Sequence, residues 1–171
     1  MDLKQHIREI LDFPKPGILF RDIAPILASP EALAEVIERL ATIAKDVGAE
    51  KIAAFDARGF VFGAPLATKL GLPFIMLRKK GKLPGVTVSE SYALEYGDAT
   101  LEMQSDAVAK DERILLIDDL LATGGTSKAG ALLIEKVGGV VAGIAYVIEL
   151  GALGGRKVLA GYPTFTLVTY E

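Results

Sequence analysis

One fourteen-residue stretch constrains the fold of this chain more than any other. It reads ILLIDDLLATGGTS and runs from Ile114 to Ser127. Its first four residues are apolar, which is typical of a strand buried on both faces, and two carboxylates, Asp118 and Asp119, follow directly. A loop of small residues and a helical pattern come next. The stretch therefore predicts a strand, a loop and the start of a helix, as in an α/β protein.

The loop after the two acids has the composition of a phosphate site. Backbone N–H groups at a helix N-terminus point outward and carry partial positive charge. Gly124 and Gly125 let the backbone approach a ligand, and three hydroxyl donors flank them: Thr123, Thr126 and Ser127. A Walker A loop would need a lysine here, and no GxGxxG fingerprint follows the strand. We therefore predict a bound phosphate beside two carboxylates that could accept hydrogen bonds from a sugar; the plainer alternative is an ordinary strand–helix connection.

Composition limits the classes of protein to consider. The 171 residues suit one domain, and a hydrophobic content of 51% can supply a large core. No apolar run is long enough to span a bilayer, and the N-terminus lacks the pattern of a signal peptide, so no membrane partner is expected. The absence of cysteine excludes disulfides and suits a cytoplasmic protein. A net charge of −3 argues against a nucleic-acid partner.

Hydrophobic periodicity and turn residues predict the other elements. The predicted helices cover residues 2–11, from Pro30 to about 47, 60–70 and 126–137. The predicted strands cover residues 51–55, 73–77, 140–148 and 164–170, with a hairpin of 87–96 and 100–104 turning at Gly97-Asp98 and a loop at 151–155. His6, the only histidine, lies on the polar side of the first predicted helix, so no histidine general base is expected.

Two charged loops complement the predicted phosphate site. Arg58 follows the strand of residues 51–55 and so lies where ligand sites of α/β proteins gather, although it could be an ordinary surface residue. The segment 78–82 carries four positive charges in five residues. A solvated basic turn would explain it, but a polyanionic substrate requires local positive charge on an acidic chain.

These motifs resemble those of one enzyme family. IDDLLATGGT resembles the phosphoribosyl-pyrophosphate motif of the type I phosphoribosyltransferases, in the Leu-Leu form of the adenine phosphoribosyltransferases. FPKPGILFRDI, DARGF, RKKGKLPG, SYALEYG and the C-terminal segment also resemble that branch, so the likeness covers essentially the whole chain. It implies the type I phosphoribosyltransferase fold, an α/β domain of residues 1–171 with a central, mostly parallel, twisted sheet flanked by helices. It also implies a base-binding hood of about residues 1–28, a flexible hairpin lid of about residues 79–104, and a homodimer.

The resemblance implies where ribose, 5-phosphate and base bind. The residues for the ribose 5-phosphate are Asp118, Asp119, Ala122, Thr123, Gly124, Gly125 and Thr126. Backbone groups of Leu19 and Arg21 would bind the edge of adenine, with Phe20 stacked on the ring and Leu120 as a hypothetical opposite wall. A backbone C=O and N–H match adenine's 6-amino donor and N1 acceptor. A 6-oxopurine presents the reverse pattern, and each buried mismatch costs about 1–3 kcal/mol.

The resemblance also implies the residues for pyrophosphate and proton transfer. The pyrophosphate residues are Arg58, Arg78, Lys79, Lys82 and Tyr96, with a cis peptide expected at Asp56–Ala57. Glu95 would accept the proton from N7 of adenine, although an exposed strand glutamate is the plainer interpretation, and Arg58 would stabilise the departing pyrophosphate.

The implied reaction converts adenine and phosphoribosyl pyrophosphate to AMP and pyrophosphate, in purine salvage. Mg²⁺ would bind mainly through pyrophosphate and water, so we name no protein ligand for the metal. The alternatives are a phosphoribosyltransferase for xanthine, hypoxanthine or orotate, and a regulator that senses phosphoribosyl pyrophosphate and binds nucleic acid. A phosphate-binding structural module would leave the basic loop unexplained.

Overall fold

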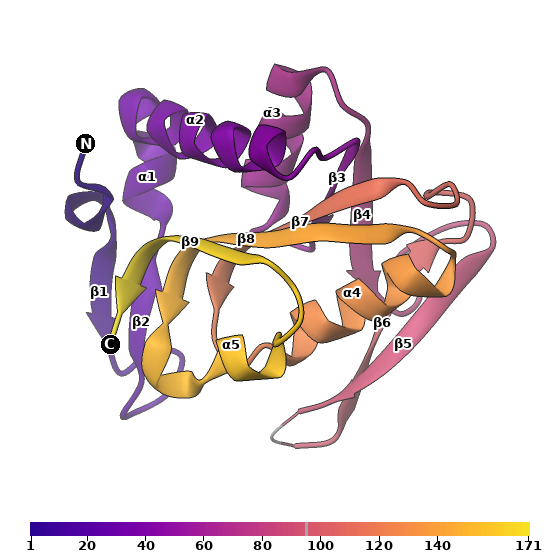
Figure 1. The fold of residues 1–171 in the computed structure, drawn as a ribbon. Coiled ribbons are helices and arrows are strands. Elements are labelled where there is room, and N and C mark those ends of the chain that lie inside the picture. Colours follow the sequence, from indigo (N-terminus) through magenta and orange to yellow (C-terminus); the bar gives the residue numbers. More distant parts are fainter. Residues whose placement is uncertain (95) are drawn as a thin grey trace.

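The described residues form a seven-stranded sheet in the order β5-β6-β4-β3-β7-β8-β9 (Figure 1). The computed structural model describes residues 1–94 and 96–171, so Glu95 lies outside the described residues. The parallel strands are β3 (Lys51–Phe55), β4 (Phe74–Lys79), β7 (Arg113–Leu121), β8 (Val140–Leu150) and β9 (Thr164–Tyr170). The hairpin of β5 (Thr87–Ala93) and β6 (Asp98–Gln104) joins β4 in antiparallel fashion. The predicted α/β fold with a mostly parallel sheet is confirmed.

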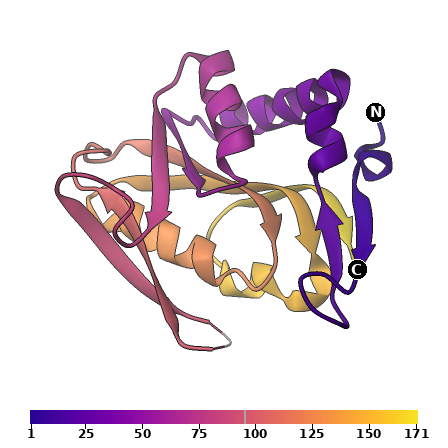
Figure 2. The same cartoon turned by 180° about the vertical axis from the view of Figure 1, so that it is seen from behind.

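Helices cover both faces of the sheet (Figures 1 and 2). One face carries α1 (Ala24–Ala28), α2 (Pro30–Asp46) and α3 (Phe60–Leu70), and the other carries α4 (Gly125–Lys136) and α5 (Gly155–Val158). Alternate residues of the strands supply the two cores, because successive strand side chains point to opposite faces. In β7, Leu115 and Ile117 belong to the core under α2 and α3, whereas Ile114 and Leu116 belong to the core under α4.

The long helices begin and end within one residue of their predicted bounds. The Ser29 hydroxyl accepts a hydrogen bond from the backbone N–H of Ala32 at 3.2 Å and caps α2, whose first residue is Pro30. Gly48 and Gly71 follow α2 and α3 with φ of +65°, a conformation that glycine adopts without penalty. Within the described residues, no helix combines the length and apolarity that crossing a membrane requires.

The predicted helix of residues 2–11 is wrong in most of its length. The segment forms a short 3₁₀ helix, η1 (Leu3–His6), and then strand β1 (Arg8–Leu11), which pairs with β2 (Leu19–Asp22) in a separate two-stranded sheet. Ion pairs link the facing positions of this ladder: Arg8 with Asp22, and Glu9 with Arg21. Pairing with a distant strand thus overrides the weak helical spacing of the segment. This antiparallel pair is the core of the predicted hood.

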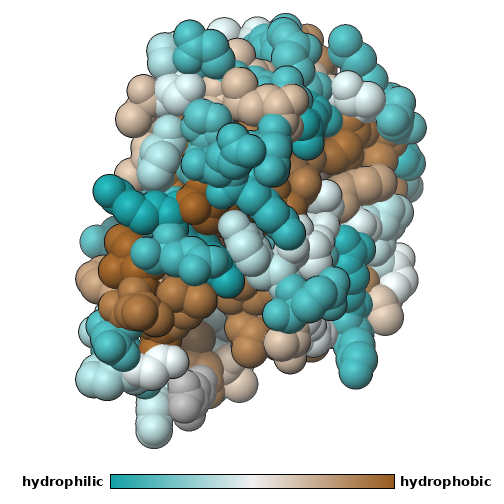
Figure 3. Space-filling model, turned by 90° about the vertical axis from the view of Figure 1, so that its left-hand side faces the viewer, coloured by the Kyte–Doolittle hydropathy of each residue, from teal (hydrophilic) through white to brown (hydrophobic). Residues whose placement is uncertain are grey.

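The hood exposes apolar side chains. Figure 3 shows the side of the molecule that carries it, where apolar side chains gather below a more hydrophilic upper part. The exposed apolar residues of the hood include Leu11, Phe13 and Leu19. The ring of Phe13 meets that of Phe20 edge-on, with 5.1 Å between the centroids. The hood therefore presents aromatic and apolar surface on the same segment that was predicted to bind a base.

Several boundaries differ from prediction because of strand pairing and local helix formation. Strand β7 continues through both acids to Leu121, since its pairing with β8 extends that far. Asp98 pairs with Ala93 and so belongs to β6 rather than to a two-residue turn. The predicted loop at 151–155 contains a 3₁₀ helix, η2 (Gly151–Leu153), and the first residue of α5. Helix α1 was not predicted.

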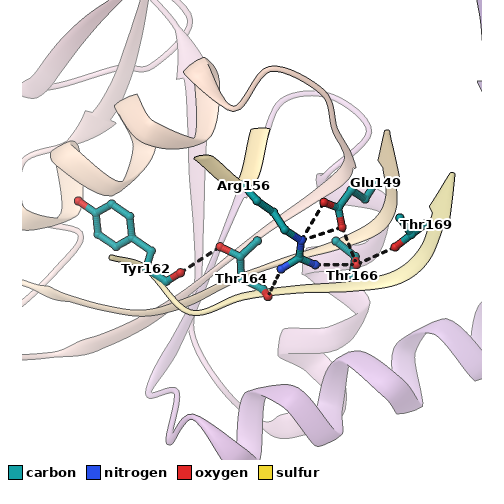
Figure 4. A network of polar contacts seen from close by, with 6 residues as sticks. All are labelled: Glu149, Arg156, Tyr162, Thr164, Thr166 and Thr169. Atoms are coloured by element: carbon teal, nitrogen blue, oxygen red, sulfur yellow. Dashed lines mark hydrogen bonds and ion pairs between the residues drawn. The ribbon is translucent and has the colours of Figure 1, made fainter. Parts of the chain in front are cut away.

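A polar network fastens α5 to the ends of β8 and β9 (Figure 4). The Nε of Arg156 donates to both carboxylate oxygens of Glu149, at 2.8 and 2.9 Å. The guanidinium also donates to the backbone oxygen of Thr164 at 2.9 Å and to the hydroxyl of Thr166 at 3.0 Å. Thr166 in turn donates to Glu149 at 3.0 Å. Because Glu149 is only 6% exposed, the network is a buried contact between α5 and the sheet and not a surface ion pair.

The hydrogen bonds of Glu149 predict a pH-dependent contribution to the stability of the fold. Burial alone would raise the pKa of Glu149, but the hydrogen bonds from Arg156 and Thr166 and the charge of Arg156 lower it overall. A carboxyl with a lowered folded-state pKa stabilises the protein above its unfolded pKa of about 4.3, and this stabilisation is lost as the pH falls through the folded value. Glu149→Gln should therefore lower the free energy of unfolding by about 1–2 kcal/mol at neutral pH, because Arg156 is partly hydrated.

Urea unfolding at about pH 7 and about pH 4 measures this effect. The difference between Glu149→Gln and the unaltered protein should shrink at the lower pH. Glu35→Gln is the matched control, because Glu35 forms a half-exposed pair with Arg39 four residues on in α2, and such pairs contribute little. An equal effect of the two substitutions would contradict the assignment of Glu149 to a buried contact.

Candidate active site

Three adjoining cavities lie where β3 and β7 end. A cavity of about 80 Å³ is enclosed by the end of β7 and the start of α4; its lining residues are Asp118, Leu120, Leu121, Ala122, Thr123, Gly124, Gly125, Thr126 and Ser127. A second cavity of about 280 Å³ is lined by Phe55, Asp56, Ala57, Arg58, Lys79, Tyr92, Asp118, Asp119 and Thr126. A third of about 530 Å³ is bounded by β5 and the loop after β7. The first two share Asp118 and Thr126, so they form neighbouring parts of one site.

The small cavity is formed by a loop that only glycine can complete. Gly124 has a φ of +87°, and a Cβ there would lie 2.8 Å from the backbone oxygen of Gly155. A Cβ on Gly155 would lie 2.5 Å from the backbone oxygen of Ala122. The backbone of α5 is thus in direct contact with the loop, which leads into the N-terminus of α4 at Gly125. This arrangement fits an anion held by backbone N–H groups.

The two adjacent acids face different partners. Asp119 is 5% exposed, and its Oδ2 accepts a hydrogen bond from Nε of Arg58 at 2.5 Å. Asp118 instead lines the small cavity, and its Oδ1 accepts the backbone N–H of Asp119 at 2.9 Å. Parallel pairing of β3 with β7 brings the loop that carries Arg58 beside the acids.

Burial and mutual charge determine the electrostatics of the pair. Burial raises the pKa of Asp118 well above its usual range, and the neighbouring charge of Asp119 adds to this effect. For Arg58, partial burial acts to lower the pKa, but the hydrogen bond to Asp119 and the charges of both acids raise it overall. Ionisation of Asp118 is therefore disfavoured here, and a cationic or hydrogen-bond-donating ligand would favour its ionised form.

The structure brings some of the predicted pyrophosphate residues to the second cavity but not others. Arg58 and Lys79 line it, beside the Asp56–Ala57 peptide, which is cis as expected. Arg78 lies next to it: its Nε donates to Oδ2 of Asp56 at 2.8 Å, and its guanidinium also donates to the backbone oxygen of Lys82 at 3.2 Å. The side chain of Tyr96 is 82% exposed, and that of Lys82 is exposed too, so neither is gathered into the site.

The base segment approaches the site through Phe20. The guanidinium carbon of Arg58 lies 5.8 Å from the centroid of the Phe20 ring. The side chain of Arg21 points elsewhere, because it pairs with Glu9 and lies 3.7 Å from the centroid of the Tyr170 ring. Leu120 lines the small cavity and packs against the apolar core; its place opposite Phe20 stays a prediction.

Two polar side chains of the site were not among the predicted site residues. Tyr92 lines both the second and the third cavity, and Asp56 pairs with Arg78. Asp56 follows directly on a buried strand, and this position alone could have identified it. Tyr92 carries no such signal, because tyrosine in an alternating strand is common.

Comparisons with known proteins agree with this geometry. The family model for the phosphoribosyl transferase domain matches residues 23–164. An adenine phosphoribosyltransferase from Synechococcus sp. (strain CC9605) is 54% identical over 171 residues, which is 99% of this chain and 99% of the relative. The crystal structure of the adenine phosphoribosyltransferase from Thermoanaerobacter pseudethanolicus superposes with a TM-score of 0.95 at 49% identity, over 99% of this chain and 98% of that one.

A more distant solved structure carries ligands. The adenine phosphoribosyltransferase from Saccharomyces cerevisiae, complexed with an imino-altritol bisphosphate and adenine, superposes with a TM-score of 0.93 at 34% identity, over 97% of this chain and 96% of that one. Close relatives and solved structures thus share one fold and one name over nearly the full chain. The chain belongs to the adenine phosphoribosyltransferase family, within the phosphoribosyl transferase domain proteins.

Proposed function

We propose that this protein transfers the 5-phosphoribosyl group from phosphoribosyl pyrophosphate to adenine, giving AMP and pyrophosphate in purine salvage. The observation that carries the proposal is the pair of cavities joined at Asp118. One has the glycine loop and helix N-terminus of a phosphate site, and the other has the cations Arg58 and Lys79. The yeast relative with adenine bound supports the choice of base.

The ribose 5-phosphate would lie between the loop and the acids. The proposed phosphate ligands are the loop residues Ala122, Thr123, Gly124, Gly125 and Thr126. Their N–H groups and hydroxyls would donate to the phosphate oxygens at the N-terminus of α4. Asp118 and Asp119 would accept hydrogen bonds from the ribose hydroxyls. Held at both ends, the sugar would present its C1 atom to the base in a fixed orientation.

Bond formation would occur between N9 of adenine and C1 of the ribose as the bond from C1 to the pyrophosphate oxygen breaks. The sugar gains positive charge in the transition state, and the leaving group gains negative charge. Arg58 and Lys79 would stabilise that negative charge, with Arg78, Lys82 and Tyr96 approaching when substrate binds. Glu95, which lies outside the described residues, would accept the proton from N7 and so neutralise the new AMP base.

Adenine would be bound by the hood. Backbone groups of Leu19 and Arg21 would match its amino donor and N1 acceptor, and Phe20 would stack on one face of the ring. Two contacts support a position of adenine against Phe20: the edge contact of Phe20 with Phe13, and the guanidinium of Arg58 near the Phe20 ring. Leu120 is the proposed opposite wall. Selection of adenine would then depend on backbone groups that a 6-oxopurine leaves unpaired.

The donor set is compatible with magnesium, which would supply further charge neutralisation of the pyrophosphate when bound. Among the described residues no cluster of three or more possible metal-binding side chains is formed, and Arg58 already pairs with Asp119. We propose that the ion is held mainly by pyrophosphate oxygens and water, and that the acids accept hydrogen bonds from its waters. We also propose a cytoplasmic homodimer built from one domain, whose hairpin of about residues 79–104 closes over the site as a lid.

A panel of bases tests the proposed reaction. With phosphoribosyl pyrophosphate and magnesium present, adenine should release pyrophosphate and yield AMP, while hypoxanthine, xanthine and orotate should release at least about a hundredfold less, because each leaves buried polar groups unpaired. Release assays with a chelator present should show the dependence on magnesium. Salt-dependent nucleic-acid binding without AMP formation would instead favour the alternative function, a regulator that senses phosphoribosyl pyrophosphate and binds nucleic acid.

Glu95→Gln tests the proton acceptor. Turnover should fall by about 10²–10⁴-fold, the usual contribution of general base catalysis, while the affinity for phosphoribosyl pyrophosphate stays near normal. Glu90→Gln is the matched control on the same hairpin, because Glu90 pairs with Lys136 away from the cavities. Steady-state kinetics of both variants decide the matter, and an unchanged turnover in Glu95→Gln would remove Glu95 from the mechanism.

Lys79→Gln tests the pyrophosphate part of the site. Removing a cation from the second cavity should raise KM for phosphoribosyl pyrophosphate about tenfold and weaken product inhibition by pyrophosphate similarly. The adjacent Lys80 is exposed and is not among the residues lining that cavity, so Lys80→Gln controls for the loss of one positive charge. Equal effects of the two substitutions would point to general electrostatics and not to a contact.

A further inference from the structure

A buried pair of hydroxyl groups lies directly behind the small cavity. The hydroxyl of Tyr146, on β8, donates a hydrogen bond to Oγ of Ser127 in the first turn of α4. Tyr146 is fully buried, and Ser127 is 4% exposed. In the pairing of β7 with β8, Tyr146 stands next to Asp118. The pair therefore links the core of the sheet to the wall of the proposed phosphate site.

The Ser127 hydroxyl retains a proton that it can donate. A serine hydroxyl has one O–H donor and two acceptor lone pairs, and Tyr146 uses only an acceptor position. Within residues 1–94 and 96–171, no protein acceptor takes a hydrogen bond from Oγ of Ser127. Ser127 also lines the cavity of about 80 Å³. Its O–H group is therefore available to a phosphate oxygen bound in that cavity.

The environment of Tyr146 keeps it a donor. Burial raises the pKa of its phenol, so the group stays protonated over the whole physiological range. A hydroxyl that accepts a hydrogen bond is polarised and becomes a stronger donor to its own acceptor. The oxygens of a phosphate accept hydrogen bonds and carry negative charge, so a hydrogen bond from such a donor to phosphate is stronger than one to water.

We propose that Ser127 is a further ligand of the ribose 5-phosphate and that Tyr146 is a positioning residue that orients and polarises the Ser127 hydroxyl. The chain Tyr146 O–H to Ser127 O–H to phosphate adds a side-chain donor beneath the backbone donors of the loop. The inference rests on the proposed function, since it requires a phosphorylated ribose in the small cavity.

The test compares Tyr146→Phe, Ser127→Ala and the double variant. Each single substitution should weaken the binding of ribose 5-phosphate, and raise KM for phosphoribosyl pyrophosphate, by about three- to tenfold, the effect of one hydrogen bond to a charged group. The affinities for adenine and for pyrophosphate should stay unchanged. Since Tyr146 acts through Ser127, the double variant should bind ribose 5-phosphate no more weakly than Ser127→Ala. Calorimetric titration of the full-length protein with each ligand measures these affinities.

Tyr162→Phe is the matched control. It removes a hydroxyl that donates to Glu135 near the other end of α4, at 3.0 Å, and it leaves the same aromatic ring in place. It should not alter ribose 5-phosphate binding. If Tyr146→Phe does not fold, Ser127→Ala and the control still decide the question.

The outcomes separate the inference from the proposed function. Unchanged ribose 5-phosphate binding in Ser127→Ala, or an equal weakening of ribose 5-phosphate and pyrophosphate, would overturn the inference while the proposed function stands. Failure of the unaltered protein to bind ribose 5-phosphate at all would overturn the proposed function, and the inference with it.

Discussion

The site depends on the position of β7 between β3 and β8. This strand carries both acids at its end, and its parallel pairing on each side determines what stands next to them. On the β3 side, the loop with Arg58 comes within hydrogen-bond distance of Asp119. On the β8 side, Tyr146 contacts Ser127 in the first turn of α4, and Glu149 contacts Arg156 in α5. The C-terminal ends of parallel strands lie at the same edge of a sheet. The pairing of β7 with β3 and β8 therefore brings side chains from all three strands together.

Charge at this edge is arranged in matched pairs. The chain has a net charge of −3, so binding of a polyanion requires local positive charge. The arginines at this edge are each held by an ion pair with a neighbouring carboxylate. Arg58 is held by Asp119, and Arg78 by Asp56. Each pair leaves part of its guanidinium free for a ligand, while the acid keeps the side chain in one position. Preorganised cations of this kind lower the cost of ordering when a charged substrate binds.

The glycine loop between β7 and α4, the proposed phosphate site, is supported by α5 and by the core of the sheet. The backbone of Gly155 contacts it so closely that no side chain fits between, and the Arg156–Glu149 network fixes α5 in that position. Tyr146 reaches the same loop through Ser127 from the core of the sheet. These supports are buried polar groups, which in a low-dielectric interior are strong when fully satisfied. No buried side-chain polar atom among the described residues lacks a hydrogen-bond partner.

The sequence by itself determined most of the long elements and the candidate residues at the ends of the strands, because these follow from patterns within a few positions: the apolar run before the acids, the glycine loop, the Ser-Pro helix start and the basic turn. The candidate base-binding residues and Glu95 came only from the resemblance to a known family. Local patterns failed at residues 2–11, where a helix-like spacing forms a strand because β2 pairs with it. Only the tertiary structure decided which polar side chains meet. Arg58 and Asp119 are 61 positions apart, Arg78 and Asp56 are 22, and Tyr146 and Ser127 are 19. Such contacts depend on strand order and register, and these arise from the burial of whole faces of the sheet and not from any local preference of the chain.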